Sequence, residues 1–324
     1  MTITQDDPAT TSSTMKHFIS IAQTTYEELR HTLDVAKRLK KQLKETGRND
    51  PILAGKTLAM IFEKPSLRTK VSFAVAMTQL GGAGLYLTRE EVGLGVREAI
   101  KDVSRVLSGM CDGIMARTFS HDHLKELAAH ATVPVINALT GYSHPCQALS
   151  DMLTIEEHFC ANGGSLKGKT LVYVGDGNNV ARSLSVACGK FGMRFVCVCP
   201  AGYTLPEDDM DRIMSQVPGM DFETTSDPQE AVREADVIYT DTWTSMGQEE
   251  EKAKRIRDFA GFAIDEKLLA RAPKHAVVLH CLPAYRGYEI SDAVMESPRS
   301  LVFPQAENRL HFQKGLLAVL MGGM

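Results

Sequence analysis

The sequence predicts an α/β fold made of two doubly wound parallel-sheet domains, and three observations support it. Apolar stretches of strand length alternate with helical patterns along the chain. The length of 324 residues suits two domains of about 150 residues each. Gly-Lys-Thr-Leu occurs at 55–58 and again at 168–171, and each copy opens an apolar strand that leads through a polar loop into a helix. Ligands bind at the carboxyl edges of such sheets, so we expect the active site in the cleft between the domains.

The composition excludes several classes of protein. With 44% hydrophobic and 23% charged residues, the chain resembles an ordinary globular protein. Its formal net charge of −4 argues against a nucleic-acid partner and against a polybasic membrane binder. The apolar run at 315–321 is too short to span a bilayer. We therefore expect partners that are neither nucleic acids nor membranes.

The cysteines and the N-terminus indicate where the protein works. None of the seven cysteines forms a C-x-x-C pair, so we predict no metal site and expect buried thiols in a reducing compartment. Residues 1–14 are polar and lack the arginines and the apolar core of a targeting signal. We predict that they form a disordered extension and that the protein is cytoplasmic.

The elements of the first half follow from periodicity and from turn residues. Residues 26–46 form a basic amphipathic pattern, which predicts a solvated surface helix. A helix is predicted from about Val71 to Leu80, where Gly81 and Gly82 end it. Another is predicted over 147–160. The predicted strands are 58–62, 112–116 and 133–137.

The second half repeats this organisation. Its predicted strands are 171–174, 195–199, 237–240 and 276–279, and the charged run 248–259 predicts a solvated helix. We place the domain boundary inside the helix near 148–165. The first domain then covers 15–148, and the second covers 149–303.

A phosphate site is predicted in the loop after the first strand. Ser66 and Thr69 supply hydroxyl groups, and Arg68 supplies a planar guanidinium suited to phosphate oxygens. The helix that follows presents free backbone N–H groups and the positive end of its dipole. The alternative is that Ser66 only caps the helix and that the cations are solvated. Both interpretations stay open from these residues alone.

A second group lies at the same predicted sheet edge. Arg117 ends a strand, while His144 and Gln147 open the helix of the boundary region. Each could also be an ordinary surface side chain.

The loop after the first strand of the second half resembles a dinucleotide-binding motif only in part. Gly175 and Gly177 fit, but Val180 replaces the third glycine, and the next strand ends without the acid that holds a ribose. The amide of Asn178 suits an amino-acid carboxylate and amine. Asp241, at a strand end, is either a turn cap or a counter-ion for an ammonium group.

Taken together, these motifs resemble the aspartate/ornithine carbamoyltransferase family, and the downstream ones resemble its ornithine-specific members. The resemblance runs from Met15 to the C-terminus. It implies transfer of the carbamoyl group of carbamoyl phosphate to the δ-amine of L-ornithine, giving citrulline, without a cofactor. The matching motifs are Ser66-x-Arg-Thr69, Arg117-Thr-Phe119, His144-Pro-Cys-Gln147, Asp176-Gly-Asn-Asn179, Asp241-Thr-Trp-Thr-Ser-Met-Gly247, His280-Cys-Leu-Pro283 and Glu307-Asn-Arg309.

The resemblance also implies the role of each residue. A final helix at 304–324 would return to the first domain and bring Arg309 to the site. Arg117, His144, Asp241 and Cys281 are the expected catalytic residues, and a cis peptide is expected at Leu282–Pro283. Carbamoyl phosphate would be held by Ser66, Leu67 through its backbone, Arg68, Thr69, Arg117, His144, Gln147, the carbonyls of Cys281 and Leu282, and Arg309.

Ornithine would be bound by residues of the second domain. Asn178, Asp241, Ser245 and Met246 would hold its amino-acid head, and Cys281 beside Asp241 would favour the neutral δ-amine. Adjacent strand residues point to opposite faces, so we predict no dyad of Cys281 with its neighbour His280.

Two positions depart from the family pattern. Lys70 replaces an arginine that often ends the phosphate loop, and it keeps the charge without the planar fork. Gly93 stands where a neighbouring subunit usually supplies a glutamine, so either Arg97 replaces that contact or the contact is missing. The family implies a homotrimer or a multiple of trimers.

Three alternatives remain open at the level of sequence. The amine could be aspartate, putrescine or an N-acylated ornithine. The chain could be a nicotinamide-dependent dehydrogenase, which Val180 and Pro200 disfavour. It could also be a catalytically silent binding or regulatory protein. Biosynthetic and catabolic directions would use the same residues.

Overall fold

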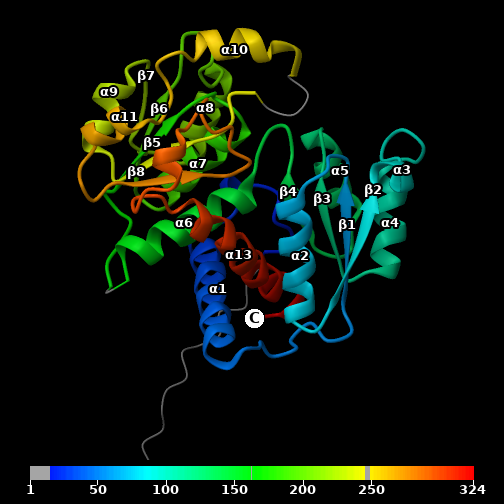
Figure 1. Cartoon of the computed structure of the whole chain (residues 1–324). Coiled ribbons are helices and arrows are strands. Elements are labelled where there is room, and N and C mark those ends of the chain that lie inside the picture. The colour runs from blue at the N-terminus through cyan, green and yellow to red at the C-terminus, as the bar shows by residue number, and fades with distance from the viewer. Residues whose placement is uncertain (1–14, 162, 245–248) are drawn as a thin grey trace, which may run out of the picture.

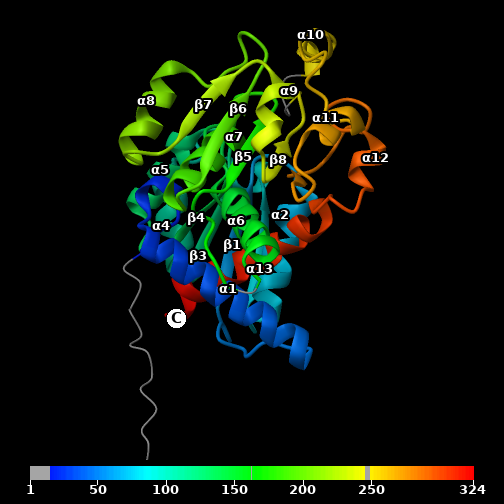
Figure 2. The ribbon, with the colours of Figure 1, turned by 90° about the vertical axis from the view of Figure 1, so that its left-hand side faces the viewer.

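The computed structural model describes residues 15–161, 163–244 and 249–324. They form two α/β units, each built on a parallel sheet (Figure 1). The predicted disordered extension at 1–14 lies outside the described residues. Figure 2 shows the second unit stacked above the first, with α6 (Pro145–Phe159) running between them. No helix in the described part of the chain is long and apolar enough to cross a bilayer.

Both sheets are entirely parallel, as the alternating pattern predicted. The first has the order β2-β1-β3-β4 and the second has the order β7-β6-β5-β8-β9. The predicted strands occur within two residues of their expected positions. The strands are β1 (Thr57–Phe62), β2 (Ala83–Thr88), β3 (Gly113–Arg117), β4 (Val135–Leu139), β5 (Thr170–Val174), β6 (Arg194–Val198), β7 (Phe222–Thr225), β8 (Val237–Thr240) and β9 (Val277–His280).

The helices flank the two sheets. The remaining α-helices are α1 (Tyr26–Thr46), α2 (Leu67–Gln79), α3 (Arg89–Val92), α4 (Ile100–Met110), α5 (His121–His130), α7 (Asn179–Lys190), α8 (Glu207–Gln216), α9 (Pro228–Ala231), α10 (Lys252–Asp258), α11 (Glu266–Arg271), α12 (Asp292–Met295) and α13 (Val302–Gly322). Short 3₁₀ turns occur at η1 (Ile21–Gln23), η2 (Val232–Glu234) and η3 (Glu249–Glu251).

Helix α2 begins four residues before the predicted start, and this matters for the site. Ser66 is its N-cap, and the Ser66 hydroxyl accepts a hydrogen bond from the Thr69 backbone N–H at 3.3 Å. Leu67, Arg68 and Thr69 therefore lie in the first turn, beside the free N–H groups of the helix end. Likewise α6 starts at Pro145, which needs no N–H partner there, and makes His144 its N-cap.

The prediction that 26–46 is a solvated helix is wrong for one face. Helix α1 packs against α13, and Leu29, Leu33 and Ala36 are buried. The backbones approach so closely that a Cβ on Gly315 would lie 2.8 Å from Ala36 Cα. The sequence could not reveal this contact because the two helices lie near opposite ends of the chain.

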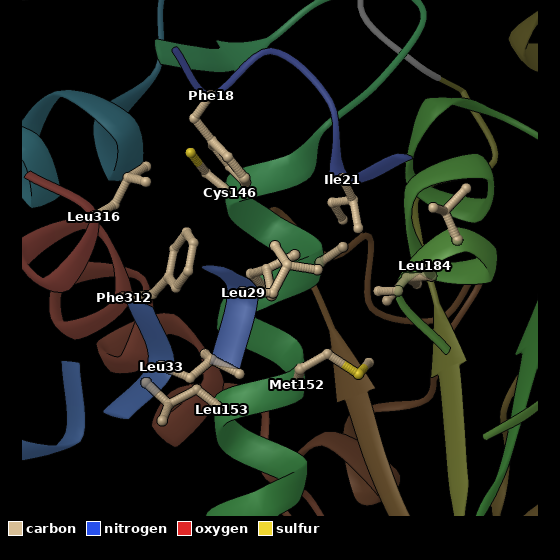
Figure 3. Packing of buried hydrophobic residues seen from close by; sticks show 14 of the residues in the cluster. Phe18, Ile21, Leu29, Leu33, Cys146, Met152, Leu153, Leu184, Phe312 and Leu316 are labelled. Atoms are coloured by element: carbon tan, nitrogen blue, oxygen red, sulfur yellow. The ribbon is translucent and has the colours of Figure 1, made fainter. Parts of the chain in front are cut away.

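The C-terminal helix α13 packs against α1, α2 and α6, although it follows the last strand of the second sheet (Figure 1). Phe312 and Leu316 of α13 join Leu29 of α1 and Leu153 of α6 in one hydrophobic cluster (Figure 3). The cluster continues through α6 to the second sheet at Tyr239. This continuous core fixes the two sheet edges relative to each other.

A buried lysine on α13 gives a stability prediction. Lys314 is fully buried, its ammonium donates to Asn49 Oδ1 at 2.7 Å, and burial lowers its pKa to about 8. We expect Lys314→Met to raise the free energy of unfolding by about 2 kcal/mol at pH 7, even though Asn49 loses its partner.

The sign of the pH dependence follows from the lowered pKa. Folding disfavours the charged lysine, so the wild type gains stability as the pH rises from about 8 toward the unfolded value near 10.5. Urea unfolding of both proteins from pH 7 to pH 10 should show the gap closing. A methionine variant that is less stable at pH 7 would contradict the argument.

Candidate active site

A cavity of about 360 Å³ opens at the carboxyl edges of both sheets, where parallel α/β folds bind ligands. Its walls come from the loop after β1, from the ends of β3, β4, β8 and β9, and from α13. The lining residues are Lys64, Pro65, Ser66, Leu67, Arg68, Arg117, Leu139, His144, Gln147, Asn179, Val180, Asp241, Thr242, Thr244, Cys281, Leu282, Pro283, Tyr285 and Arg309.

Three arginines give the cavity a concentrated positive charge. Arg68, Arg117 and Arg309 line it, and none of the three forms an ion pair with a described residue. Arg117 and Arg309 are at most 5% exposed. Burial and the neighbouring Arg309 and Arg68 lower the pKa of Arg117 to about 10. Buried cations without counter-ions are costly, so this cavity is built to receive an anion.

The first turn of α2 adds hydrogen-bond donors beside these charges. The Ser66 hydroxyl donates to Thr69 Oγ1 at 3.0 Å, and Arg309 Nη2 donates to the same oxygen at 2.9 Å. Arg309 thus joins α13 to the first turn of α2. Backbone N–H groups at a helix start favour phosphate or carboxylate groups.

His144 is a neutral imidazole in this environment. It is 5% exposed, and burial together with Arg309 and Arg117 keeps its pKa well below the ordinary value. Its Nδ1 atom has no partner among the described residues. The backbone N–H of His144 donates to Ser183 Oγ at 2.8 Å and ties this turn to α7. His144 can therefore hydrogen-bond a ligand without adding charge.

A carboxylate and a thiol face the arginines from the second sheet. The Cys281 thiol donates to Asp241 Oδ1 at 2.9 Å, and Asn178 Nδ2 donates to Asp241 Oδ2 at 3.0 Å. Burial and the Asp241 carboxylate raise the pKa of Cys281 well above its ordinary value. Cys281 is therefore a protonated thiol and a poor nucleophile.

His280 lies nearer to Cys281 than strand alternation predicted. One potential ligand atom each from Asp241, His280 and Cys281 lies within 4.8 Å of the others. Cys281 follows the last residue of β9, so alternation no longer holds there. The expected absence of a dyad agrees with the hydrogen bonds, since His280 Nε2 lies 3.0 Å from Glu289 Oε1 and His280 Nδ1 accepts from the Leu282 N–H at 2.9 Å. Both ring nitrogens of His280 are engaged in these contacts and the Cys281 thiol is protonated, so the three groups do not offer free ligand atoms to a metal ion.

Two family models match the chain. The model described as "Aspartate/ornithine carbamoyltransferase, carbamoyl-P binding domain" matches residues 16–157, and the one described as "Aspartate/ornithine carbamoyltransferase, Asp/Orn binding domain" matches residues 167–320. The chain belongs to the aspartate/ornithine carbamoyltransferase family. Both halves of the family pattern are present, in the order that the resemblance implied.

Relatives of this carbamoyltransferase family cover nearly the whole chain. An ornithine carbamoyltransferase of Methanopyrus kandleri is 47% identical over 94% of this chain and 97% of its own length. One of Pyrococcus furiosus, named anabolic, is 49% identical over 93% and 94%. The solved P. furiosus structure has a TM-score of 0.90 and covers 95% of this chain and 98% of that chain at 47% identity. The solved Thermus thermophilus structure has a TM-score of 0.84 at 40% identity, covering 95% and 100%.

The structure brings most of the predicted site residues together. Ten of them line the cavity. Thr69 and Asn178 do not line it, but they form hydrogen bonds with Arg309 and Asp241, which do. Ser245 and Met246 lie outside the described residues. The Leu282–Pro283 peptide is cis, as the carbamoyltransferase resemblance implied.

Sequence reasoning missed several lining residues. Lys64 could have been found, because it is a cation inside the predicted phosphate loop. Asn179, Thr242 and Thr244 could also have been found, because they lie inside the quoted motifs 176–179 and 241–247. Leu139 and Tyr285 carry no comparable signal, since only the tertiary structure places them at the cavity.

The positions that depart from the family pattern lie away from this cavity. Gly93 is the C-cap of α3 and has a φ of 59°, a left-handed conformation that favours glycine. The exposed Arg97 guanidinium donates to the Glu91 carbonyl of its own loop. Lys70 Nζ lies 3.6 Å from the centre of the Tyr86 ring.

Proposed function

We propose that the chain transfers the carbamoyl group of carbamoyl phosphate to the δ-amine of L-ornithine, producing L-citrulline and phosphate. One observation carries the proposal. Three arginines without ion-pair partners among the described residues line the same cavity as one carboxylate, Asp241, which comes from the end of β8. The arginines come from α2, β3 and α13. Such a site suits a dianion on one side and an ammonium group on the other. The anabolic relative from P. furiosus supports the biosynthetic direction.

Carbamoyl phosphate fits the first half of the site. Its phosphate would bind the first turn of α2, with Ser66, the Leu67 backbone and Arg68 as donors. Arg117, Thr69 and His144 would stabilise the negative charge that develops on the carbonyl oxygen. The carbamoyl end would also be bound by Gln147, by the carbonyls of Cys281 and Leu282, and by Arg309.

Ornithine fits the second half. Asp241 would pair with its α-ammonium, and Asn178 would contact its carboxylate. By the family pattern, Ser245 and Met246 would also hold this amino-acid head. The Cys281 thiol, hydrogen-bonded to Asp241, adds no charge beside the δ-amine. Holding both substrates in one cleft lowers the activation barrier mainly through proximity.

The reaction needs no covalent enzyme intermediate. The neutral δ-amine attacks the carbamoyl carbon, and the C–O bond to phosphate breaks as the new C–N bond forms. The departing phosphate accepts the proton of the amine. In the proposed mechanism these steps need no cofactor. The arginine cluster stabilises the negative charge on the carbonyl oxygen and on the departing phosphate.

The substrate assignment is tested with a panel of amines. Purified protein should form a ureido product and phosphate from carbamoyl phosphate and ornithine. Putrescine keeps the second ammonium group but lacks the carboxylate. N-acetylornithine lacks the α-ammonium that Asp241 would pair with, and aspartate adds a carboxylate near Asp241. We expect each to react at least about 100-fold more slowly at equal concentration. A preference for any of them would contradict the proposal.

The pH profile gives a separate prediction. The δ-amine must lose a proton from an ordinary pKa near 10.4 before it attacks. His144 stays neutral above pH 6 because burial and two arginines lower its pKa. We expect kcat/KM for ornithine to rise up to tenfold per pH unit between pH 6 and pH 9. A flat profile over this range would exclude attack by the free amine.

We also propose that the chain assembles as a homotrimer or a multiple of it, in the cytoplasm. Leu67, Val71 and Leu85 are each at least 48% exposed on α2 and on the edge strand β2, an apolar surface of the kind that subunits bury. All seven cysteines are free, which supports a reducing compartment. Light scattering should give a multiple of three times the 35.6 kDa chain mass, and a monomer would contradict the assembly.

A further inference from the structure

A buried carboxylate lies directly behind the carbamoyl end of the site. Asp151 is on α6, one turn after Gln147, and is fully buried. Its Oδ1 accepts hydrogen bonds from Gln147 Nε2 at 2.8 Å and from Gln305 Nε2 at 2.7 Å, and its Oδ2 accepts one from the Tyr239 hydroxyl at 3.1 Å. In the described part of the chain it has no ion-pair partner. A carboxylate in this position is costly, and burial raises its pKa to about 7.

The contact with Asp151 decides how the amide of Gln147 is turned. Above pH 7 the ionised Asp151 carboxylate only accepts hydrogen bonds, so the Nε2 end of the amide must face it, as the 2.8 Å contact shows. The other end, Oε1, is then left as an acceptor. Gln147 lines the cavity, and its Oε1 is buried without a partner among the described residues. A ligand in the cavity can therefore complete this hydrogen bond.

An acceptor side chain is unusual among the neighbours of Gln147. Arg117, Arg309 and neutral His144 all offer hydrogen-bond donors to the cavity. A carbamoyl group has an oxygen that suits these donors and an NH₂ group that suits Oε1. If the Gln147 amide were reversed, its N–H groups would face the NH₂ of the ligand, and both would lose their hydrogen bonds.

We propose that Asp151 is a positioning residue that fixes the amide of Gln147 and thereby makes the site select an acyl phosphate bearing NH₂ over one bearing a methyl group. The inference rests on the proposed function, because it concerns how that same substrate is recognised. It predicts that the donor preference depends on a side chain that the substrate does not touch.

The test compares carbamoyl phosphate with acetyl phosphate, which replaces NH₂ by methyl. In the full-length protein, KM for carbamoyl phosphate and Ki for acetyl phosphate are measured for the wild type and for Asp151→Asn. Asparagine keeps the shape but adds a donor, which allows both orientations of Gln147. We expect KM for carbamoyl phosphate to rise about tenfold, while Ki for acetyl phosphate and KM for ornithine change less than twofold.

Two further variants separate positioning from a merely structural role. Tyr239→Phe removes one hydrogen bond to Asp151 but keeps the contact between Asp151 and Gln147. The ratio of Ki for acetyl phosphate to KM for carbamoyl phosphate should therefore stay as in the wild type. The double variant Gln147→Glu/Asp151→Asn exchanges the two functional groups. The carboxylate at position 147 then offers an oxygen to the ligand in either orientation, and its second oxygen accepts a hydrogen bond from the amide at position 151. The carboxylate, now next to the ligand, weakens binding of both acyl phosphates, but the ratio of Ki for acetyl phosphate to KM for carbamoyl phosphate should recover.

Several outcomes would overturn the inference. An unchanged ratio in Asp151→Asn, or an equal loss in Tyr239→Phe, would show that Asp151 does not act through Gln147. If the asparagine variant does not fold, Asp151→Ser, in which water can fill the space, must show the same fall in ratio. A wild type inactive with ornithine would instead contradict the proposed function, and calorimetric Kd values for the two acyl phosphates would still test Asp151.

Discussion

Replacing Arg117 by methionine should lower kcat/KM for carbamoyl phosphate about 10³-fold. Its guanidinium is 5% exposed and has no carboxylate partner among the described residues. In the proposed complex it stabilises the developing oxyanion, where charged hydrogen bonds in a water-poor site are worth about 4 kcal/mol. Initial rates at varied carbamoyl phosphate and saturating ornithine measure the loss.

The same substitution should stabilise the free protein. Burial and the charges of Arg309 and Arg68 lower the pKa of Arg117, which means that the folded state disfavours its charge. Methionine removes this cost, so the melting temperature should rise while activity falls. As a control, Arg105→Met changes an exposed arginine on α4 and should leave kcat/KM unchanged. Lost activity together with a lower melting temperature would indicate misfolding and contradict the role given to Arg117.

Replacing Asp241 by asparagine should have the second-largest effect. The substitution keeps the size of the side chain and removes the carboxylate that faces the cavity from the end of β8. We expect kcat/KM for ornithine to fall at least about 10²-fold, since a buried ammonium would lose its counter-ion. KM for carbamoyl phosphate should change less than threefold, because Asp241 does not contact that substrate in the proposed complex.

Cys281→Ser is the matched comparison for Asp241→Asn. A serine hydroxyl can donate to Asp241 Oδ1 as the thiol does at 2.9 Å, so the carboxylate keeps its position. We expect a loss of about tenfold or less. Equal losses in the two variants, or a large rise in KM for carbamoyl phosphate in Asp241→Asn, would contradict the assignment of Asp241 to the ornithine side.

Local patterns predicted the buried strands, including the edge strands β4 and β9, and missed the two exposed edge strands. Strand β5, with its five buried residues, is a continuous apolar run in the sequence. The edge strands β2 and β7 went unpredicted, because they are partly exposed and carry Gly84, Glu223 and other polar residues. The start of α2 was placed too late because the polar residues of its first turn resemble a loop, although Ser66 caps it.

The motifs located most of the candidate site, and packing explains the remainder. Ser66, Arg68 and His144 lie next to sequence features, a strand end or a helix start, that can be recognised locally. Asp151 has no such feature, since it resembles any polar residue of a helix until Gln147, Gln305 and Tyr239 surround it. Its partners come from three elements that meet only in the folded core.

The amino-acid sequence by itself determined the alternation of strands and helices, the loop after β1 that we propose binds phosphate, and the residue types available at each strand end, because these depend on neighbours along the chain. Only the tertiary structure decided the ionisation state and the hydrogen-bond partners of the site side chains. It places Arg309 against Thr69 from 240 residues away, and it keeps Cys281 protonated beside Asp241. Burial and the field of nearby charges control these properties, and both arise from residues that are distant in the chain and adjacent in space.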